Sequence, residues 1–326
     1  MRTKIYILVM TIIWATNFTV CAWGQYLSIH TIQFTNNPDG ASSYDGNIVN
    51  CKGGIVVRKF IRTVPRLLIQ DPNNSRGWGG IQVKDRYNIT NGFQGIELGD
   101  RITLANVKVE EFRGTTFLQL YESLNPQITV ISRGNKLPEP ILVEPNQIAA
   151  PRQDAYGNFL VADHRAEKYE SMLLILKNVT VGQMGRGKAN DNYVLESVKD
   201  PGKICWAADY INEDKNPFEP YLPAIKSGQR ICTMVGMLEQ YTNFYGGFDY
   251  YQLLTTIDDD ILLPGQADLD ANCRVDFYDF CLFSQQWLKQ SCDQPKWCGG
   301  ADFNHNHAVE LSDLVIFAKS WLEGIW

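Results

Sequence analysis

Oxygen-bearing side chains recur at fixed spacing in two twelve-residue stretches near the C-terminus. The first runs from Asp268 to Asp279, and the second runs from Asp302 to Asp313, 34 residues later. In both, positions 1, 3, 5, 9 and 12 carry Asp, Asn or Glu. Calcium is a hard cation that takes six to eight oxygens, and a twelve-residue loop supplies them from these positions and from the carbonyl of position 7. The pattern therefore predicts two calcium sites.

Each loop has a complete set of predicted ligands. They are Asp268, Asp270, Asn272, the Arg274 carbonyl, Asp276 and Asp279 in the first loop, and Asp302, Asn304, Asn306, the Ala308 carbonyl, Glu310 and Asp313 in the second. Position 6, usually Gly for a sharp turn, is Cys273 in one loop and His307 in the other. Ligand charge favours tighter binding by the first loop, whereas Cys273 at its turn works against this. The order of affinities therefore stays open.

The segments that position these loops are also repeated. Each loop runs into an apolar helix, and the same offset relates Phe283 to Phe317 and Trp287 to Trp321. An offset that preserves both a polar loop and an apolar helix indicates a structural repeat. Pro264 and Gly265 lie just before the first loop, so we expect no helix to lead into it.

This pair of loop–helix units resembles a type I dockerin, the calcium-binding module by which secreted bacterial proteins bind a cohesin on a scaffold or cell surface. The resemblance covers residues 265–322. It implies two bound Ca²⁺ ions, a cohesin-like partner and a place in polysaccharide catabolism. By the same resemblance, the partner-binding residues are Phe277, Tyr278, Gln285, Lys289, Leu311, Ser312, Lys319 and Glu323.

The N-terminus has the pattern of a secretory signal peptide. Arg2 and Lys4 precede an apolar run, and Ala22 and Gly24 supply small residues before a cleavage site. We therefore expect residues 1–24 to be removed and the mature chain to be secreted. Disulfides are allowed outside the cell. Cys292 and Cys298 are placed to pair, and Cys205 and Cys232 either pair or are buried. The odd count leaves a free thiol, for which we favour Cys51.

The composition is that of a folded chain with several domains. Apolar residues make up 44%, aromatic residues 12% and charged residues 20%, and the net charge is −6. A mature chain of this length is expected to divide into two or three domains. The charge balance gives no whole-protein basic field for nucleic acid.

Between the signal peptide and the calcium loops the pattern is β. Short β-branched runs separated by Gly, Asn, Asp and Pro predict a five-stranded barrel of the OB type over residues 27–134. A Gly-Asp-x-Ile strand pattern at residues 99–102 recurs in part at 228–231 and predicts a second barrel over residues 165–262, with a Pro-rich connector at 135–164. Tandem domains of this kind resemble the OB-like domains of other secreted bacterial proteins. The predicted fold class is thus mainly β, followed by a small all-α calcium-binding domain at 265–326.

OB barrels bind oligonucleotides or oligosaccharides on one face and through their loops. Cations with aromatic side chains suit such a ligand. The predicted ligand-binding residues are Arg58, Lys59, Arg62, Arg66, Trp78, Tyr245 and Tyr250. Few cations accompany the aromatic residues of the second barrel, which favours a sugar polymer over nucleic acid.

No residue of the barrels is predicted to be catalytic. Glu110 and Glu239 occupy matching positions in the two copies, as a shared strand end would give without catalysis. The preferred interpretation is therefore a secreted, non-catalytic component that binds a polymer and is docked through calcium. The alternative is a glycoside hydrolase or nuclease with an unrecognised carboxylate site. A third possibility is that the calcium unit is only an intramolecular stabilising clip.

Overall fold

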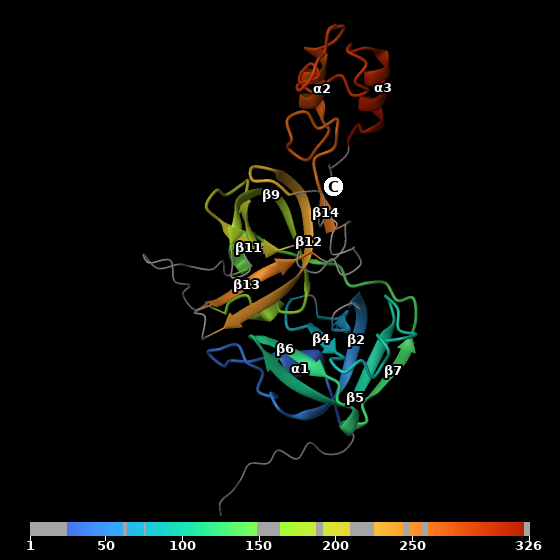
Figure 1. Cartoon of the computed structure of the whole chain (residues 1–326), viewed down its shortest axis with the longest axis vertical. Helices are drawn as coiled ribbons and strands as arrows, with labels where there is room; N and C mark the ends of the chain where they lie inside the picture. Colours follow the sequence, from blue (N-terminus) through green and yellow to red (C-terminus); the bar gives the residue numbers. More distant parts are fainter. Residues whose placement is uncertain are drawn as a thin grey trace, which may run out of the picture.

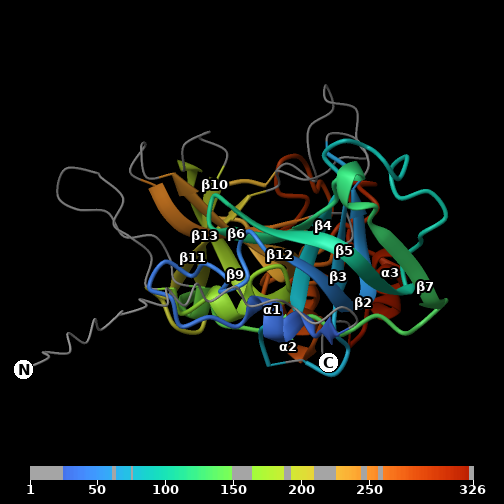
Figure 2. The same cartoon turned by 90° about the horizontal axis from the view of Figure 1, so that it is seen from below.

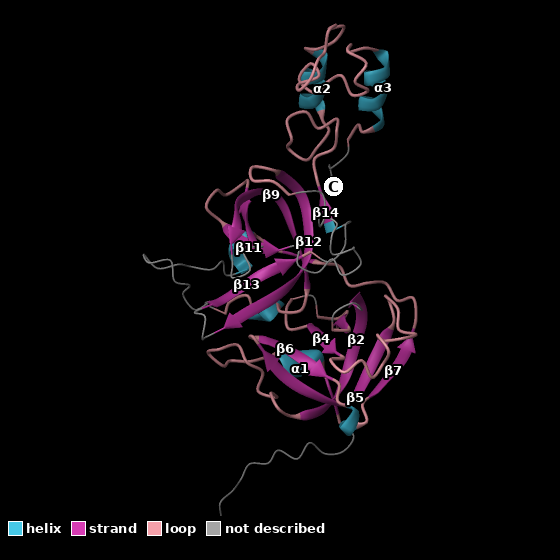
Figure 3. Cartoon of the chain, viewed as in Figure 1, coloured by secondary structure: helices cyan, strands magenta, loops and turns pink. Residues whose placement is uncertain are grey.

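The structure is a computed structural model that describes residues 25–60, 64–74, 76–148, 164–186, 192–208, 225–243, 248–255 and 260–322. Strands dominate the described chain, and its helices are short (Figure 3). The signal peptide predicted at residues 1–24 lies outside the described residues. No helix in the described ranges has the length and apolar character needed to cross a lipid bilayer.

Barrel 1 is built from five strands that close on one another. They are β2 (Ile48–Phe60), β3 (Arg66–Gln70), β4 (Gly80–Lys84), β5 (Arg101–Phe112) and β6 (Thr115–Gln119). The strand order is β2-β3-β4-β6-β5, and a further pairing of β5 with β2 closes the barrel. Only β4 and β6 pair in parallel within this set. This is the Greek-key order of an OB barrel, so the predicted mainly-β fold with a five-stranded barrel is confirmed.

Barrel 2 repeats the same order. Its strands are β9 (Leu173–Arg186), β10 (Asn192–Ser197), β11 (Ile204–Ala208), β12 (Arg230–Asn243) and β13 (Phe248–Leu254). The order β12-β13-β11-β10-β9 is closed by pairing of β9 with β12, and β11 and β13 are parallel. The internal repeat noticed in the sequence therefore corresponds to two barrels of equal topology.

Side chains that alternate between the inside and the outside of the barrel along each strand create the two cores. On β5, for example, Ile102, Leu104, Val107 and Val109 are fully buried inside barrel 1. The long β2 bends to follow the barrel, and Gly53 adopts a φ of +64° at an irregularity in the β2–β5 ladder. A Cβ on Gly53 would lie 1.8 Å from the Ile102 carbonyl oxygen, so only glycine fits this crossing.

Short elements flank the barrels. Barrel 1 carries β1 (Tyr26–Leu27), α1 (Ile29–Gln33), η1 (Glu122–Leu124) and β7 (Gln127–Ser132); barrel 2 carries β8 (Ile141–Leu142), η2 (Pro145–Ile148), η3 (Glu167–Tyr169) and β14 (Ile261–Leu262). The connector predicted at 135–164 is thus partly structured, because β8 pairs with β9 at the edge of the barrel 2 sheet.

The two barrels pack directly on each other, as Figures 1 and 2 show. A buried apolar cluster spans the contact and joins Val57, Phe60 and Leu68 of barrel 1 to Leu173, Ala208, Met237 and Leu254 of barrel 2. Polar side chains bridge it as well: Gln70 Oε1 accepts the Leu173 backbone N–H at 3.0 Å, and Thr115 Oγ1 donates to the Gln240 carbonyl at 2.9 Å. We call this contact the barrel junction.

The C-terminal segment, residues 265–322, extends beyond barrel 2 (Figure 1). It contains α2 (Phe277–Ser284) and α3 (Leu311–Lys319), and the rest is loop and turn. Disulfides join Cys232 to Cys273 and Cys292 to Cys298. The predicted Cys292–Cys298 pair is therefore present, Cys232 pairs with the first calcium loop and not with Cys205, and Cys51 is a buried free thiol. That this segment is an all-α domain stays a prediction.

Candidate metal centre and barrel junction

The first loop folds around two carboxylates at its ends. Asp268 accepts the backbone N–H groups of Asn272 at 3.0 Å and Cys273 at 2.7 Å. Asp279 accepts N–H groups from Leu269 at 2.8 Å and, by its other oxygen, from Asp276 at 2.9 Å. These bonds wrap the backbone into a tight loop.

The second loop repeats this arrangement 34 residues later. Asp302 accepts the N–H groups of Asn306 at 3.1 Å and His307 at 2.9 Å. Asp313 accepts those of Phe303 at 2.8 Å and Glu310 at 2.9 Å. The sequence repeat therefore extends to the hydrogen bonds, and both terminal carboxylates of the second loop are fully buried.

The sharp turn at position 6 forms in both loops without glycine. Cys273 and His307 each have a φ of 71°, in the left-handed region. The Cys273 side chain is bonded to Cys232 of β12, and Arg230 Nε of the same strand donates to the Ala271 carbonyl at 3.0 Å. Barrel 2 therefore holds the first loop at two adjacent points.

The two loop–helix units pack reciprocally. The Leu288 N–H, just beyond α2, donates to the Val309 carbonyl at 3.0 Å, and the equivalent Leu322 N–H beyond α3 donates to the Val275 carbonyl at 3.0 Å. Val275, Val309, Phe283 and Phe317 are buried in a shared core, and the Phe283 and Phe317 rings stack at 5.5 Å. The residue that follows each helix thus forms a hydrogen bond to the loop of the other unit.

The first loop fits a hard divalent cation. Ligand oxygens of Asp268, Asp270 and Asp279 all lie within 4.8 Å of one another. Asn272 Oδ1, at position 5, is buried and accepts no hydrogen bond from the described residues. A buried oxygen without a donor is costly unless a cation or another donor satisfies it. Carboxylate and amide oxygens together make the ligand set that Ca²⁺ prefers.

The predicted partner-binding residues lie on and after the two helices. Phe277 and Leu311 begin α2 and α3 and are 69% and 67% exposed, and Tyr278 is 59% exposed beside Phe277. Ser312 Oγ donates to Glu310 Oε1 at 3.1 Å. Gln285 caps α2, Lys289 Nζ donates to Gln286 at 2.8 Å, and Lys319 ends α3. Glu323 lies outside the described residues.

Several of the predicted ligand-binding side chains that the structure describes are buried or bonded within the barrels. Arg58 is 9% exposed and forms an ion pair with Asp260 at 2.7 Å. Lys59 Nζ donates to the Ile96 carbonyl at 2.7 Å, and Tyr250 is buried against Trp206 with their ring centroids 4.9 Å apart.

Two further members of this set contact aromatic rings. The Arg66 guanidinium lies 4.9 Å from the Phe60 ring centroid, and the Trp78 ring meets Phe34 edge-on. Arg62 and Tyr245 lie outside the described residues. A ligand-binding role for this set stays a prediction.

Three glutamates that the sequence did not group meet at the barrel junction: Glu111, Glu167 and Glu170, here called the carboxyl cluster. Tyr251 Oη donates to Glu167 Oε2 at 2.5 Å, and the Thr116 N–H donates to Glu170 Oε1 at 3.0 Å. Thr116 Oγ1 donates to Glu111. The second oxygens of Glu111 and Glu170 accept no hydrogen bond from the described residues.

Burial controls the charge of this cluster. It raises the pKa of Glu111 to about 7 and that of Glu167 to about 8, and it raises the pKa of Glu170 well above 4.5. The neighbouring carboxylates add to each shift, because like charges in a low dielectric disfavour ionisation. No local sequence signal brings these residues together, since Glu111 belongs to barrel 1 and the other two precede β9.

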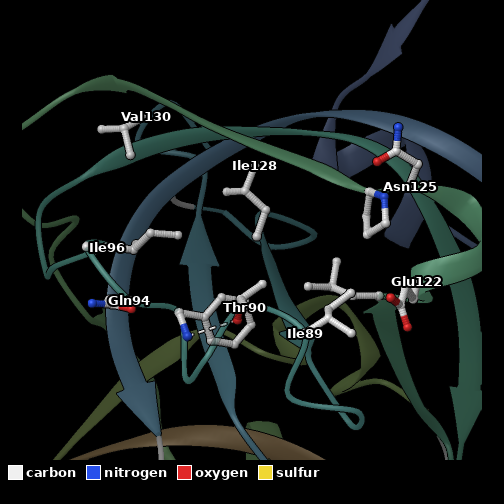
Figure 4. Close-up of a pocket in the computed structure, with 12 residues that line it drawn as sticks. Ile89, Thr90, Gln94, Ile96, Glu122, Asn125, Ile128 and Val130 are labelled. Carbon is white, nitrogen blue, oxygen red and sulfur yellow. Dashed lines mark hydrogen bonds between the residues drawn. The ribbon is translucent and has the colours of Figure 1, made fainter.

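A cavity of about 460 Å³ opens on barrel 1 between the loop before β5 and strand β7. Figure 4 shows Ile89, Ile96 and Ile128 directed into it. Glu122 is the one ionisable residue among those that line it. Glycoside hydrolysis requires a pair of carboxyl groups across a cleft, and this cavity does not provide such a pair.

No protein-family model matches the sequence, and no curated protein matches it. Among solved structures, the chain is similar to a murine DNA-binding protein bound to double-stranded DNA, with 8% identity and a TM-score of 0.30 over 65% of this chain and 95% of that one. It is also similar to fission yeast Pot1 with single-stranded DNA, with 12% identity and a TM-score of 0.26 over 72% and 84%.

A third similar structure is a replication protein A heterotrimer bound to single-stranded DNA, with 8% identity and a TM-score of 0.20 over 70% of this chain and 68% of that one. TM-scores this low do not establish a shared fold. The barrel assignment therefore stands on the strand order described above.

Proposed function

We propose that this protein is a secreted, non-catalytic component that docks to a cohesin-like domain through a calcium-dependent C-terminal module. Its barrels bind a polymer in the context of polysaccharide catabolism. The observation that carries the proposal is the duplicated hydrogen-bonded cage of the two loops, in which Asp268 and Asp302 accept equivalent backbone N–H groups. Resemblance to a type I dockerin supplies the partner class.

The two loops would each hold one Ca²⁺ ion. In the first, Asp268, Asp270, Asn272, Asp276 and Asp279 offer side-chain oxygens, with the Arg274 carbonyl; in the second, Asp302, Asn304, Asn306, Glu310 and Asp313 do so, with the Ala308 carbonyl. Bound calcium neutralises carboxylates that otherwise repel one another. Calcium binding and folding of this module are therefore coupled.

The exposed apolar residues at the helix starts support a docking role. Phe277 and Leu311 occupy equivalent positions on α2 and α3, and both are largely exposed although the module has its own buried core. Aromatic and apolar side chains in this state are typical of interfaces with a protein partner. Secretion is supported by the two disulfides, which persist in oxidising compartments.

A calcium-dependent binding assay with the full mature chain tests this function. Immobilised cohesin domains from secreted scaffold proteins serve as the probe, and the matched variant is Phe277→Asp/Leu311→Asp, which keeps both calcium loops intact. We expect capture in calcium, loss of capture in chelator, and loss of capture by the variant. Capture that is as strong in chelator as in calcium would overturn the proposal. It would also be overturned if none of the cohesins captured the chain.

A second candidate function is hydrolysis, which the carboxyl cluster favours. Carboxyl groups with raised pKa values, such as Glu111 and Glu167, are typical of general acids. Against this, Glu167 and Glu170 are buried at the barrel junction, where no substrate reaches them without opening the contact. A panel of glycans and DNA tests this function. Hydrolysis by the wild type that is lost in Glu167→Gln would establish that the protein is a hydrolase.

The role of an intramolecular clip also has support in the structure. The Cys232–Cys273 disulfide and the Arg230–Ala271 hydrogen bond fasten the first loop to β12. Calcium bound by that loop would therefore stabilise barrel 2 as well. This role is compatible with docking. The cohesin-binding assay described above distinguishes the two, because a module that is only a clip would capture no cohesin.

A further inference from the structure

Cationic and aromatic side chains form a continuous row across the barrel junction. The row contains Lys84 of β4, Arg86 just after it, Phe112 of β5, Arg113 of the β5–β6 turn, and Tyr241 of β12. We call these five residues the junction strip. It contains none of the ligand-binding residues predicted from the sequence, and it joins the two barrels where Arg113 of barrel 1 contacts Tyr241 of barrel 2.

Short contacts connect the members of the strip. The cationic groups of Lys84, Arg86 and Arg113 lie 5.2, 5.8 and 5.3 Å from the centroid of the Phe112 ring. Arg113 also lies 4.9 Å from the Tyr241 ring centroid, and its Nη1 donates to Tyr241 Oη at 2.6 Å. Such cation–π contacts hold long, flexible side chains in place.

The turn that carries Arg113 is built against barrel 2. Arg113 and Gly114 have φ values of 56° and 84°, as a two-residue hairpin turn of type I′ requires. The Arg113 carbonyl accepts the Thr242 N–H at 2.7 Å. A Cβ on Gly114 would lie 2.6 Å from side-chain atoms of Gln240 and Thr242. Arg113 is therefore held over β12 by its backbone, while its side chain remains exposed.

Positive charge predominates around the strip. Lys108 and Arg66 lie close to it, and the nearby carboxylates are Glu110 and Glu239. Glu110 already accepts from Lys108 Nζ at 2.9 Å and from Tyr121 Oη at 2.6 Å. Burial lowers the pKa of Lys84 to about 7, and the positive charges of Arg66 and Arg86 add to the effect. An anion bound at this place would favour the charged form of Lys84.

We propose that the junction strip binds a polysaccharide that carries carboxylate or sulfate groups. This inference rests on the proposed function of the barrels as a polymer-binding unit, and it supplies the site and the ligand class. Guanidinium groups bind carboxylate and sulfate oxygens through paired, charge-assisted hydrogen bonds. The chain as a whole has a net charge of −6, so such a ligand would be attracted by this local cluster and not by the overall charge.

The arrangement of the rings favours a charged sugar polymer over single-stranded nucleic acid. Proteins that bind single-stranded nucleic acid without sequence specificity use exposed aromatic rings on which the bases stack. In the strip, three cations lie over Phe112, and Tyr241 lies between Arg113 and Tyr250, whose ring stacks on it at 5.5 Å. The rings therefore position cations and are poorly placed to act as platforms for bases.

Affinity electrophoresis of the full mature chain in calcium tests the proposal. The probes are polygalacturonate for carboxylates, a sulfated galactan for sulfates, neutral arabinoxylan and an oligothymidylate. The variants are Arg86→Gln and Arg113→Gln, and Arg101→Gln is the matched control because it removes one exposed arginine from the opposite end of β5. We expect binding to a charged glycan that weakens with salt and falls about tenfold in each strip variant but not in the control.

The remaining outcomes overturn the proposal in distinguishable ways. Binding of arabinoxylan that neither salt nor the variants alter would mean that the barrels bind polymer elsewhere. Tighter binding of oligothymidylate than of either charged glycan would identify a nucleic-acid surface. Absence of binding to every probe would remove the polymer-binding function itself. If Arg113→Gln alters thermal unfolding, binding by Arg86→Gln and by Arg113→Lys decides, because Arg86 contacts Phe112 of its own barrel and lysine keeps the charge.

Discussion

At the scale of single residues, position 6 has the same backbone conformation in the two proposed calcium loops. The sequence left the order of affinities open because Cys273 replaces the usual glycine. In the structure Cys273 has the same left-handed φ as His307 and donates its N–H to Asp268 in the same way. The turn geometry therefore does not distinguish the two proposed sites, and we expect the first loop, which has more carboxylates, to bind Ca²⁺ more tightly.

Replacing the first ligand of each loop should therefore have unequal effects. Asp268→Ala is expected to abolish the tighter of two calcium sites, and Asp302→Ala the weaker, because the first loop has four carboxylates and the second has three. Isothermal titration calorimetry of the full chain measures both. A tighter site that survives in Asp268→Ala but not in Asp302→Ala would show that ligand charge does not set the order.

The carboxyl cluster predicts how stability depends on pH. The pKa values of Glu111 and Glu167 rise in the folded chain to about 7 and about 8 from an ordinary value of 4.5. Folding thus favours the protonated carboxyls, so this contribution is fully present below about pH 4.5 and is lost as pH rises towards about 8. The titratable groups around Glu167 include Glu111, Glu170, Asp249, Asp39 and Tyr251, and His164 contacts the Tyr251 hydroxyl.

Thermal unfolding in saturating calcium should therefore show a midpoint that falls between about pH 5 and about pH 8. Glu167→Gln keeps the shape of the side chain but cannot ionise, so its midpoint should fall less steeply over the same range. Glu97→Gln, on an exposed side chain of barrel 1, is the control and should follow the wild type. Equal slopes for all three proteins would contradict the account.

At the scale of elements, the strands of barrel 1 could be predicted because their signal is local. The run 66–70 is short and apolar at its centre, and the run 101–109 is rich in β-branched residues; they correspond to β3 and β5. The helix α1 and the short strand β8 were not predicted. Both are only a few residues long, and their contacts with the barrels stabilise them, so no periodic pattern marks them.

Packing between the barrels depends on a few apolar residues. Leu68 is fully buried against Leu173 and Met237 at the junction. Leu68→Ala should lower the free energy of unfolding by about 2–5 kcal/mol, as truncation of a buried leucine does. Leu98→Ala, at a half-exposed site, should change it by less than about 0.5 kcal/mol. Urea denaturation measures the free energy of unfolding of both variants. If both lost a similarly small amount of stability, the barrels would not depend on this contact.

The disulfide from β12 to the first loop should affect calcium binding. Cys232→Ser/Cys273→Ser removes a link that restricts the loop before calcium binds, so affinity at the first site should fall, since cross-links act mainly on the unfolded or open state. The second site should change little. Cys298→Ser, which opens the other disulfide, is the control. Calorimetry in which the double variant keeps both affinities would show that the link plays no part in binding.

At the scale of the whole molecule, the two candidate sites differ in how far the sequence reveals them. All ligands of a calcium loop lie within twelve residues, so their spacing alone is informative. The junction strip combines Lys84, Phe112 and Tyr241 from three strands and two barrels. Contacts such as Arg58–Asp260, 202 residues apart, depend on how the barrels pack. Local patterns do not contain that information, which is why the burial of Arg58 and Tyr250 could not be predicted from the sequence.

The C-terminal module is proposed to fold around two calcium ions, and calorimetric titration of Ca²⁺ into the full, chelator-treated chain measures this coupling. We expect two binding events with a parallel increase in helical signal by circular dichroism as α2 and α3 form. No heat of binding, together with a spectrum that is unchanged between chelator and excess calcium, would contradict it.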